Sequence, residues 1–499
     1  MPVPVTCDVL VVGGGGAGLA CAIEARSAGA QRVVLLEKNA ALGGSTAWSI
    51  GSVTSTRTPH QARKGIVDSP QAHWEDMPGF AGPLVARDND ALRRILCEEI
   101  PATFQWLLDS GVRFMGPMPE PPHRQPRMHN VLPNSRSFIY HLERRARAAG
   151  VEIVTGVRAN RLVQAGVRVA GVEAEGGRTW LASRGVVLAA GDFTSSAEFK
   201  RRFMGEPEAR VRGVNPTATG DAQAMAEALG ARILNGDLAL GPELRFEAPA
   251  RETLLRRLPP WRALAQFLAW SVDHLPGWLL RPFMMKFLTT ALAPSTSLFE
   301  AGARLVNSRG ERFGDECDRP AWRVPDQPGE RAWIILDAAL ARRYSSWPDY
   351  VSTAPGIAYA FLPDYLRNRP DVCVRASSLE ALAAALGMPS AALAASVLAG
   401  DRPLGTGPYI ALGPVRSVFV HAEGGLAVDA WHRVLDGEGR PLPGLFAAGS
   451  TGQGGLLLKG HGHHLAWAFV SGRRAGRFAA ASLPVADAAA LQGATAALL

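Results

Sequence analysis

The sequence has few cysteines and places them far apart. There are five, an odd number, and no two of them form a C-x-x-C pair. This pattern argues against a disulfide framework, a zinc site and c-type haem attachment. It is typical of a reducing compartment, and the N-terminus enters an apolar strand almost at once, without a signal peptide. The sequence therefore predicts a cytoplasmic protein. The five are Cys7, Cys21, Cys97, Cys317 and Cys373.

A long unbroken apolar segment is also missing. Residues 261–292 are the most apolar stretch, but Asp273, Pro276 and Arg281 interrupt them, and a membrane-spanning helix needs about 20 consecutive apolar residues. Three interpretations of this stretch stay open. It forms buried helices, a hydrophobic substrate entrance or dimer surface, or a peripheral contact with a membrane.

Dense basic runs are absent, although the chain is basic overall. Lys and Arg number 53 against 45 Asp and Glu, a net charge of +8. These residues are scattered and not interleaved with aromatic side chains, so we expect no nucleic-acid partner. The length of 499 residues predicts two domains, or one domain with a large insertion, and the hydrophobic content of 47% is enough for a large core.

Glycine is abundant, and its most informative cluster lies near the N-terminus. Gly13, Gly15 and Gly18 have the G-x-G-x-x-G spacing, between an apolar run and a helical stretch, 19–28. In this pattern Gly13 permits a tight turn, Gly15 lets the backbone approach a pyrophosphate, and Gly18 allows close helix–strand packing. The N-terminus of the helix offers free N–H groups to the phosphates. The motif predicts a dinucleotide site.

The segment after the glycines favours FAD over NAD. A second apolar run ends in Glu37, 24 residues after Gly13, where a carboxylate accepts the ribose hydroxyls and disfavours a 2′-phosphate. Gly43-Gly44-Ser45-Thr46 follows, and resembles the second cofactor contact of FAD oxidoreductases. Two further apolar runs, 185–192 and 443–450, read as buried strands that end beside the dinucleotide.

These motifs lie at both ends of the chain, so the cofactor domain must be discontinuous. The fold class is α/β, with a Rossmann-like FAD-binding domain and an inserted α+β cap. Residues 54–82 read as an extended loop. The expected boundaries are 1–235 and 406–485 for the FAD-binding domain, 236–405 for the cap, and 486–499 for a C-terminal tail.

The chain resembles the flavoprotein superfamily of soluble fumarate reductases and 3-ketosteroid dehydrogenases. The resemblance covers nearly the whole chain and is specific for the superfamily, not for a substrate. It is carried by Gly13–Glu37, Gly43–Thr46, Thr219-Gly220-Asp221, Leu305–Phe313, His421–Gly425 and Gly444–Gly476.

The resemblance implies a noncovalent FAD. Membrane-bound succinate dehydrogenases carry a flavin-linked histidine near the Gly-Gly-Ser/Thr stretch, and this chain has none there. The residues expected to bind the cofactor are Gly13, Gly15, Gly16, Ala17, Gly18, Glu37, Lys38, Gly43, Gly44, Ser45, Thr46, Val157, Ala190, Gly191, Gly449, Ser450, His464 and Leu465.

The resemblance also suggests where a substrate binds. In fumarate reductases a histidine before a Gly-Gly pair holds the substrate carboxylate, and His421 occupies that place. A second holder there is an arginine ahead of the last helix, and ketosteroid dehydrogenases place a tyrosine; here the residue is Lys459, followed by His461. The histidines of segment 459–464 could also be read as a metal site, but no carboxylate or cysteine joins them, and we expect no metal.

The cap departs from the family pattern. Reductases place a proton-shuttling arginine after the stretch that ends at Phe313, and ketosteroid dehydrogenases a tyrosine; Pro320 stands in that position here, next to Arg319. Tyr409, where the chain is expected to re-enter the FAD-binding domain, is a further candidate base or carbonyl donor.

We expect an FAD-dependent dehydrogenase that introduces a C=C bond α,β to the carbonyl of an apolar or cyclic ketone or acid. A diffusible electron acceptor or a redox protein would take up the electrons. The alternatives are an ene reductase of the fumarate reductase type and a flavin-binding protein without turnover.

Overall fold

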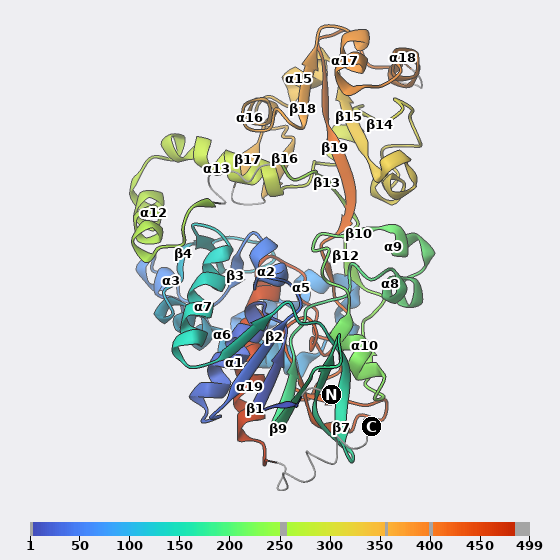
Figure 1. Ribbon diagram of the computed structural model, residues 1–499. Coiled ribbons are helices and arrows are strands. Elements are labelled where there is room, and N and C mark those ends of the chain that lie inside the picture. Colours follow the sequence, from blue (N-terminus) through green and yellow to red (C-terminus); the bar gives the residue numbers. More distant parts are fainter. Residues whose placement is uncertain (1–2, 250–256, 355–357, 399–402, 485–499) are drawn as a thin grey trace.

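The apolar run ahead of the glycine-rich turn forms β1 (Val5–Val12), a strand in the larger of two main sheets. The computed structural model describes residues 3–249, 257–354, 358–398 and 403–484 (Figure 1). β1 pairs in parallel with β2 (Val33–Glu37) on one side and β9 (Thr179–Leu188) on the other. Val12 therefore lies beside Leu36 and Leu188, and the three strands end together at one edge of the sheet.

The same sheet joins segments from both ends of the chain. β23 (Pro441–Ala447) pairs in parallel with β9, so the FAD-binding part is discontinuous, as the sequence predicts. The sheet order is β22-β23-β9-β1-β2-β6, and β7 and β8 extend it beside β9. The remaining strands are β22 (Arg433–Leu435), β6 (Glu152–Thr155), β7 (Ala159–Ala165) and β8 (Arg168–Ala174).

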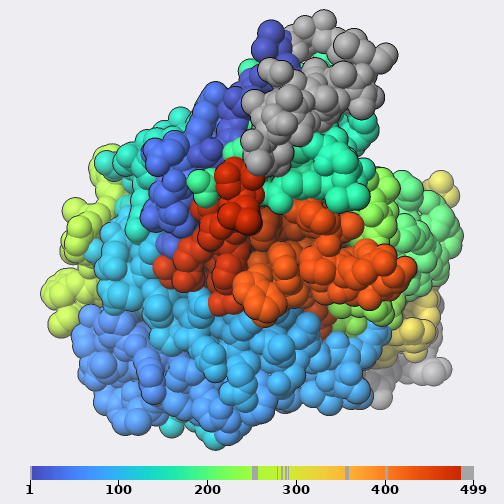
Figure 2. All heavy atoms as spheres, turned by 90° about the horizontal axis from the view of Figure 1, so that it is seen from below, coloured from blue at the N-terminus to red at the C-terminus, as the bar shows by residue number. Residues whose placement is uncertain are grey.

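The first and last described helices pack against each other on this sheet. α1 (Gly16–Ser27) contacts α19 (His463–Ala481) along its length. A Cβ atom at Gly472 of α19 would lie 2.3 Å from the carbonyl oxygen of Ala17. Only glycine allows this close approach. Seen from below, the red C-terminal and dark blue N-terminal segments lie side by side (Figure 2). Two more helices join this layer, α6 (Asp90–Asp109) and α7 (Arg136–Ala148).

The cap has its own sheet and its own hydrophobic core. Its longest strand is β19 (Tyr409–Phe419), which pairs antiparallel with β13 (Glu243–Phe246), β15 (Ala332–Leu336) and β18 (Cys373–Ala376). β14 (Arg304–Asn307) flanks β15, and β10 (Arg212–Gly213) pairs in parallel with the end of β19.

The expected domain boundary at residue 406 lies too early. β19 begins after residue 406, but it belongs to the cap, because its side chains, among them Ile410 and Leu412, are buried in the cap core. The chain returns to the FAD-binding part only after Phe419, through β20 (His421–Ala422), which pairs with β12 (Ala239–Leu240). A buried strand looks alike in sequence whichever sheet it joins, which is why the pattern missed this. The predicted tail, 486–499, lies outside the described residues.

Residues 54–82 are not an extended loop. They contain α3 (Pro59–Arg63), α4 (Pro70–Asp76) and α5 (Pro78–Ala81). Proline at the first position of a helix loses no backbone hydrogen bond, because that N–H has no partner within the helix. Thr58 and Ser69 accept hydrogen bonds from backbone N–H groups of the helices they precede. The prolines that suggested a loop therefore begin helices.

Residues 261–292 form two helices between the two parts, α12 (Arg262–His274) and α13 (Gly277–Ala291) (Figure 1). Trp261, Phe267 and Trp270 are exposed, so α12 is buried on one side only. Among the described helices, none combines the length and apolar character that a membrane crossing requires.

Candidate functional site

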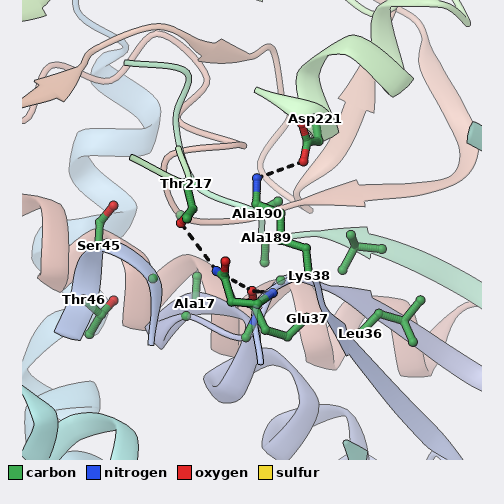
Figure 3. Close-up of a pocket in the computed structure, with 18 of the residues that line it drawn as sticks. Ala17, Leu36, Glu37, Lys38, Ser45, Thr46, Ala189, Ala190, Thr217 and Asp221 are labelled. Carbon is green, nitrogen blue, oxygen red and sulfur yellow. Dashed lines mark hydrogen bonds and ion pairs between the residues drawn. The ribbon is translucent and has the colours of Figure 1, made fainter. Parts of the chain in front are cut away.

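A cavity opens at the edge of the large sheet where β1, β2 and β9 end. Figure 3 shows side chains from these strands, from α10 (Asp221–Glu227) and from the short helix α2 (Gly44–Trp48) pointing toward the same space. It is lined by Val12–Ala17, Leu36–Asn39, Gly44–Thr46, Val157–Ala159, Ala189–Gly191, Asn215, Thr217, Asp221, Gly449, Ser450 and Ala468.

The glycine-rich turn is fixed to the end of β2. The backbone N–H of Gly14 donates to Oε2 of Glu37 at 2.8 Å, and Asn39 donates to Oε1 from its backbone and its side chain, both at 2.8 Å. The N–H of Gly16, at the start of α1, donates to Oγ1 of Thr46 at 3.1 Å. The carboxylate thus lies beside the turn, where the dinucleotide motif requires it.

The three motif glycines have different roles. Gly13 has a φ of +111°, and a Cβ there would lie 2.4 Å from the oxygen of Ala189; a Cβ on Gly18 would lie 1.8 Å from the oxygen of Gly13. The fold itself requires these two glycines. Gly15 has a φ of −80°, and a Cβ there would meet no protein atom closer than 3.7 Å. The space above Gly15 is left for a ligand, which fits the pyrophosphate of FAD.

An ion-pair network holds the outer end of the cavity. Nζ of Lys38 lies 2.9 Å from Asp221 and donates to Thr219 at 2.6 Å, and Arg158 donates to the same aspartate at 2.8 Å. Burial alone would raise the pKa of Asp221, but the hydrogen bonds from Arg158 and Lys38 lower it to about 2. The Thr-Gly-Asp segment therefore fixes Lys38 at the cavity rim.

Most of the residues expected to bind the cofactor line this cavity. Four of them do not line it: Gly18, Gly43, His464 and Leu465. Ala468 is the lining residue that α19 contributes. Sequence reasoning missed Asn215 and Thr217, which follow the edge strand β10. Asn215 donates to Oγ of Ser45 at 2.9 Å. No spacing pattern could have found them, because only the tertiary fold brings their loop to Ser45.

A buried polar cluster lies next to the cavity. Nδ1 of His421 is 3.0 Å from Oδ2 of Asp192, and its Nε2 is 3.3 Å from Oε1 of Gln453. The rings of His421 and His464 are 3.9 Å apart between centroids, and Nε2 of His464 lies 3.4 Å from Glu423. Asp192 directly follows Gly191 of the cavity, and His464 lies one turn before Ala468 on the same face of α19.

The groups of the cluster shift one another's pKa values. Burial alone would raise the pKa of Glu423, but His464 and neighbouring donors lower it to about 2, and the hydrogen bond to His421 likewise lowers the pKa of Asp192. Burial would lower the pKa of His421, but Asp192 outweighs it and raises that pKa. Burial, followed by repulsion from His421, lowers the pKa of His464. Two carboxylates and two imidazoles thus share this buried cluster.

Lys459 and His461 lie in the loop that precedes α19. The side chain of Lys459 is exposed and bonds to no other residue in the described ranges, while its carbonyl accepts a hydrogen bond from Nδ1 of His463 at 2.9 Å. Nδ1 of His461 lies 2.5 Å from Oε1 of Glu120. Sequence reasoning did not identify Glu120, because no local motif marks it.

The structure does not bring Arg319 and Tyr409 to this site. Arg319 has 79% of its side chain exposed and lies 3.7 Å from Asp318. Tyr409 is buried in the cap core and donates its hydroxyl to the carbonyl of Gly405 at 2.7 Å. It lies at the opposite end of β19 from His421, and a strand of this length spans roughly 35 Å. Tyr409 therefore has a structural partner far from the cluster.

Three buried histidines approach one another beneath the same loop. Nε2 of His463 lies 3.2 Å from Nε2 of His123 and 3.4 Å from Nε2 of His73. Ligands of a tetrahedral zinc ion, bound at about 2.0–2.1 Å, would have a similar spacing. Burial, the largest effect, lowers the pKa of all three, so they are neutral.

The hydrogen-bond partners of these histidines do not suit a metal. Nη1 of Arg127 lies 2.8 Å from Nδ1 of His123, and a guanidinium can only donate. His123 therefore carries its proton on Nε2, where a metal would need a lone pair. His463 donates from Nδ1 to Lys459, so its Nε2 accepts that proton. These tautomers are assigned from the network, and they describe an N–H···N pair, not a metal centre.

The family model described as FAD binding domain matches residues 8–246 and 266–457. The NADH:fumarate oxidoreductase of Klebsiella pneumoniae is 24% identical over 90% of this chain, which spans 44% of that relative's length. The urocanate reductase of Eggerthella lenta is 27% identical over 89% of this chain and 69% of its own.

Two solved structures have the same overall architecture. The open conformation of a flavocytochrome c3 fumarate reductase matches with a TM-score of 0.71 and 25% identity, over 96% of this chain and 78% of that chain. The 3-ketosteroid-Δ4-(5α)-dehydrogenase of Rhodococcus jostii matches with a TM-score of 0.59 and 24% identity, over 96% and 98%. The second likeness concerns the fold.

Proposed function

The chain belongs to the FAD binding domain family, and on this premise we propose that it oxidises or reduces a carbon–carbon bond adjacent to a carbonyl group. Desaturation of an apolar or cyclic ketone is the preferred activity. When bound, FAD accepts or supplies a hydride at its N5. The protein must hold the carbonyl oxygen and move one proton.

The charge of the polar cluster supports a neutral substrate. Two buried carboxylates face the cluster's histidines, Asp192 beside His421 and Glu423 beside His464. A dicarboxylate such as succinate would be repelled by this arrangement, whereas a ketone would not. The resemblance places Lys459 where fumarate reductases hold a carboxylate with an arginine. The pair of buried carboxylates, Asp192 and Glu423, is the observation that carries the proposal.

The histidines of the cluster divide the work. Both ring nitrogens of His421 have protein partners, so it acts as a positioning residue behind His464. His464 has 21% of its side chain exposed. Its imidazole and the ammonium of Lys459 are the groups that would donate to a carbonyl oxygen as negative charge develops on it.

Reduction of an unsaturated acid is the second candidate. It is favoured by the relatives named as reductases and by the 25% identity to a fumarate reductase of matching architecture. Lys459 would then pair with the substrate carboxylate.

Anaerobic flavin titration separates the candidates. A desaturase is expected to lose its flavin absorbance when a saturated cyclic ketone is added, and to recover it with a quinone-like acceptor. Succinate is the matched control and should not bleach the flavin. Rapid reoxidation of the dithionite-reduced enzyme by fumarate, without bleaching by any ketone, would contradict desaturation and favour the reductase. No response to any of these compounds would indicate a flavin-binding protein without turnover.

A further inference from the structure

Glu120 is a buried carboxylate whose hydrogen bonds converge on one histidine. It follows β4 (Arg113–Met118), and its side chain is 10% exposed. Its two oxygens lie 2.9 and 3.2 Å from the backbone nitrogen of His461, and Oε1 lies 2.5 Å from Nδ1 of the same residue. A buried carboxylate in this arrangement fixes the orientation and the tautomer of an imidazole.

Two hydrogen bonds from side chains fix the backbone of the loop at and before His461. The hydroxyl of Thr54 donates to the carbonyl of His461 at 2.6 Å, and Nδ1 of His463 donates to the carbonyl of Lys459. The imidazole itself is 50% exposed, and its Nε2 has no partner within the described parts of the chain. One ring nitrogen of this half-exposed imidazole is thus left without a protein partner, and the other is paired with Glu120.

The cap lacks the residue that moves protons in the resembled enzymes. Pro320 stands at that position, and Pro320 cannot take up or release a proton. Arg319, its neighbour, is on the surface. A proton carrier for the reaction must therefore come from elsewhere, and the loop before α19 also carries Lys459, while His464 lies in the first turn of α19.

We propose that His461, oriented by Glu120, is the acid–base residue of this enzyme and takes the place of the missing cap residue. The inference rests on the proposed function. In desaturation, Nε2 of neutral His461 removes the proton from the carbon next to the carbonyl. The hydrogen on the neighbouring carbon leaves as hydride to the flavin, and the C=C bond forms between the two carbons. A quinone-like acceptor then removes the two electrons.

Glu120 stabilises the imidazolium that results, and the exposed ring returns the proton to water. In the reverse reaction the imidazolium supplies the proton. The dyad thus works in either direction, so it fits both candidate activities. Proton transfer by such a positioned residue typically contributes a factor of about 10²–10⁴ to the rate.

The charges around His461 set the pH at which it works. The hydrogen bond that His461 donates to Glu120 is the largest effect and raises the pKa of His461; burial and Arg245 of β13 lower it, and Glu243 of β13 raises it. Lys459, two residues away, adds a further positive charge. Since the base form is needed for desaturation, kcat/KM should rise with pH through the pKa of His461.

Two variants and one control test the dyad. His461→Gln should keep its FAD and lose roughly 10²–10⁴-fold in kcat for ketone desaturation, with little change in KM. Glu120→Gln should lose roughly tenfold to a hundredfold, and the pH at which kcat/KM begins to rise should fall. His274→Gln, on α12, should behave like the wild type.

Two readouts do not depend on turnover. Exchange of the ketone α-hydrogen for deuterium, followed by NMR in D2O, should be lost in His461→Gln. Direct NMR titration should show the pKa of His461 falling in Glu120→Gln. Exchange within twofold of wild type in His461→Gln, or an unmoved pH profile in Glu120→Gln, would overturn the dyad. A wild-type enzyme that reacts with no ketone, enone or unsaturated acid would instead overturn the proposed function.

Discussion

Oδ2 of Asp192 lies 3.0 Å from Nδ1 of His421, and both side chains are buried beside the FAD cavity. The aspartate also anchors its own loop, because its other oxygen accepts hydrogen bonds from the backbone and hydroxyl of Thr194. Since Gln453 occupies the second nitrogen of His421, this pair acts through His464. The pair therefore affects the charge of the site without contacting the substrate itself.

Asp192→Asn should lower stability in a pH-dependent way. His421 has a raised pKa in the folded protein, so its contribution is fully present below its unfolded pKa of about 6.5 and is lost as pH rises through the folded value. Thermal unfolding should show a deficit of about 3 kcal/mol near pH 6, shrinking toward pH 9. Glu206→Gln, which removes an exposed ion pair with Arg201, serves as control. A deficit that does not change with pH would show that His421 is not charged.

Gly15→Val should give a folded protein without flavin. A Cβ at this position meets no close protein atom, but the side chain fills the space above the turn that the pyrophosphate needs. The measurements are the visible spectrum and the melting temperature. Gly437→Val, at another glycine with open space around it, should stay yellow. Full flavin content in Gly15→Val would place the cofactor elsewhere.

Lys459→Met should retain FAD and lose roughly 10²–10³ in rate, the range for removal of one donor to a developing oxyanion. The methionine removes the charge and keeps the length of the side chain. Stopped-flow reduction of the flavin by the ketone measures the effect. Lys64→Met, at an exposed lysine, controls for the change in net charge. Normal turnover by Lys459→Met would leave His464 as the donor.

Prolonged dialysis against a chelator should change neither flavin content nor melting temperature. The proton that Arg127 forces onto Nε2 of His123 occupies the place of a metal. Elemental analysis should find no stoichiometric transition metal. A bound ion, with a melting temperature that falls when the ion is removed, would show that His123 has the other tautomer and that Arg127 has moved.

Much of the lining of the FAD cavity could be predicted from the sequence, because these residues are close together along the chain or end neighbouring strands. Gly13, Gly15 and Gly18 lie on one turn, and Glu37 ends the neighbouring strand, so spacing alone places them together. Asn215 reaches Ser45 from a loop 170 residues away in the sequence, and no local pattern encodes that contact. The function could be narrowed to FAD-dependent oxidoreduction only because the motifs of the FAD cavity resemble those of a known family.

The cap and the catalytic residues were harder to predict. β19 has mostly buried side chains, and such a strand reads alike whether it joins the cap sheet or the FAD-binding sheet, so Tyr409 was expected near the cofactor. Glu120 has no motif of its own and is defined by its contact with His461, 341 residues away. Long-range pairs of this kind depend on the packing of the whole chain.

The packing of α1 against α19 sets an order on how the protein matures in the cell. The glycine-rich turn is synthesised long before the helix that packs on α1, in which Gly472 lies against Ala17. Until α19 is made, the FAD cavity is incomplete and the apolar surface of α1 is uncovered. We expect FAD to load only after α19 has been synthesised, and chains truncated before α19 to depend on chaperones and to remain colourless.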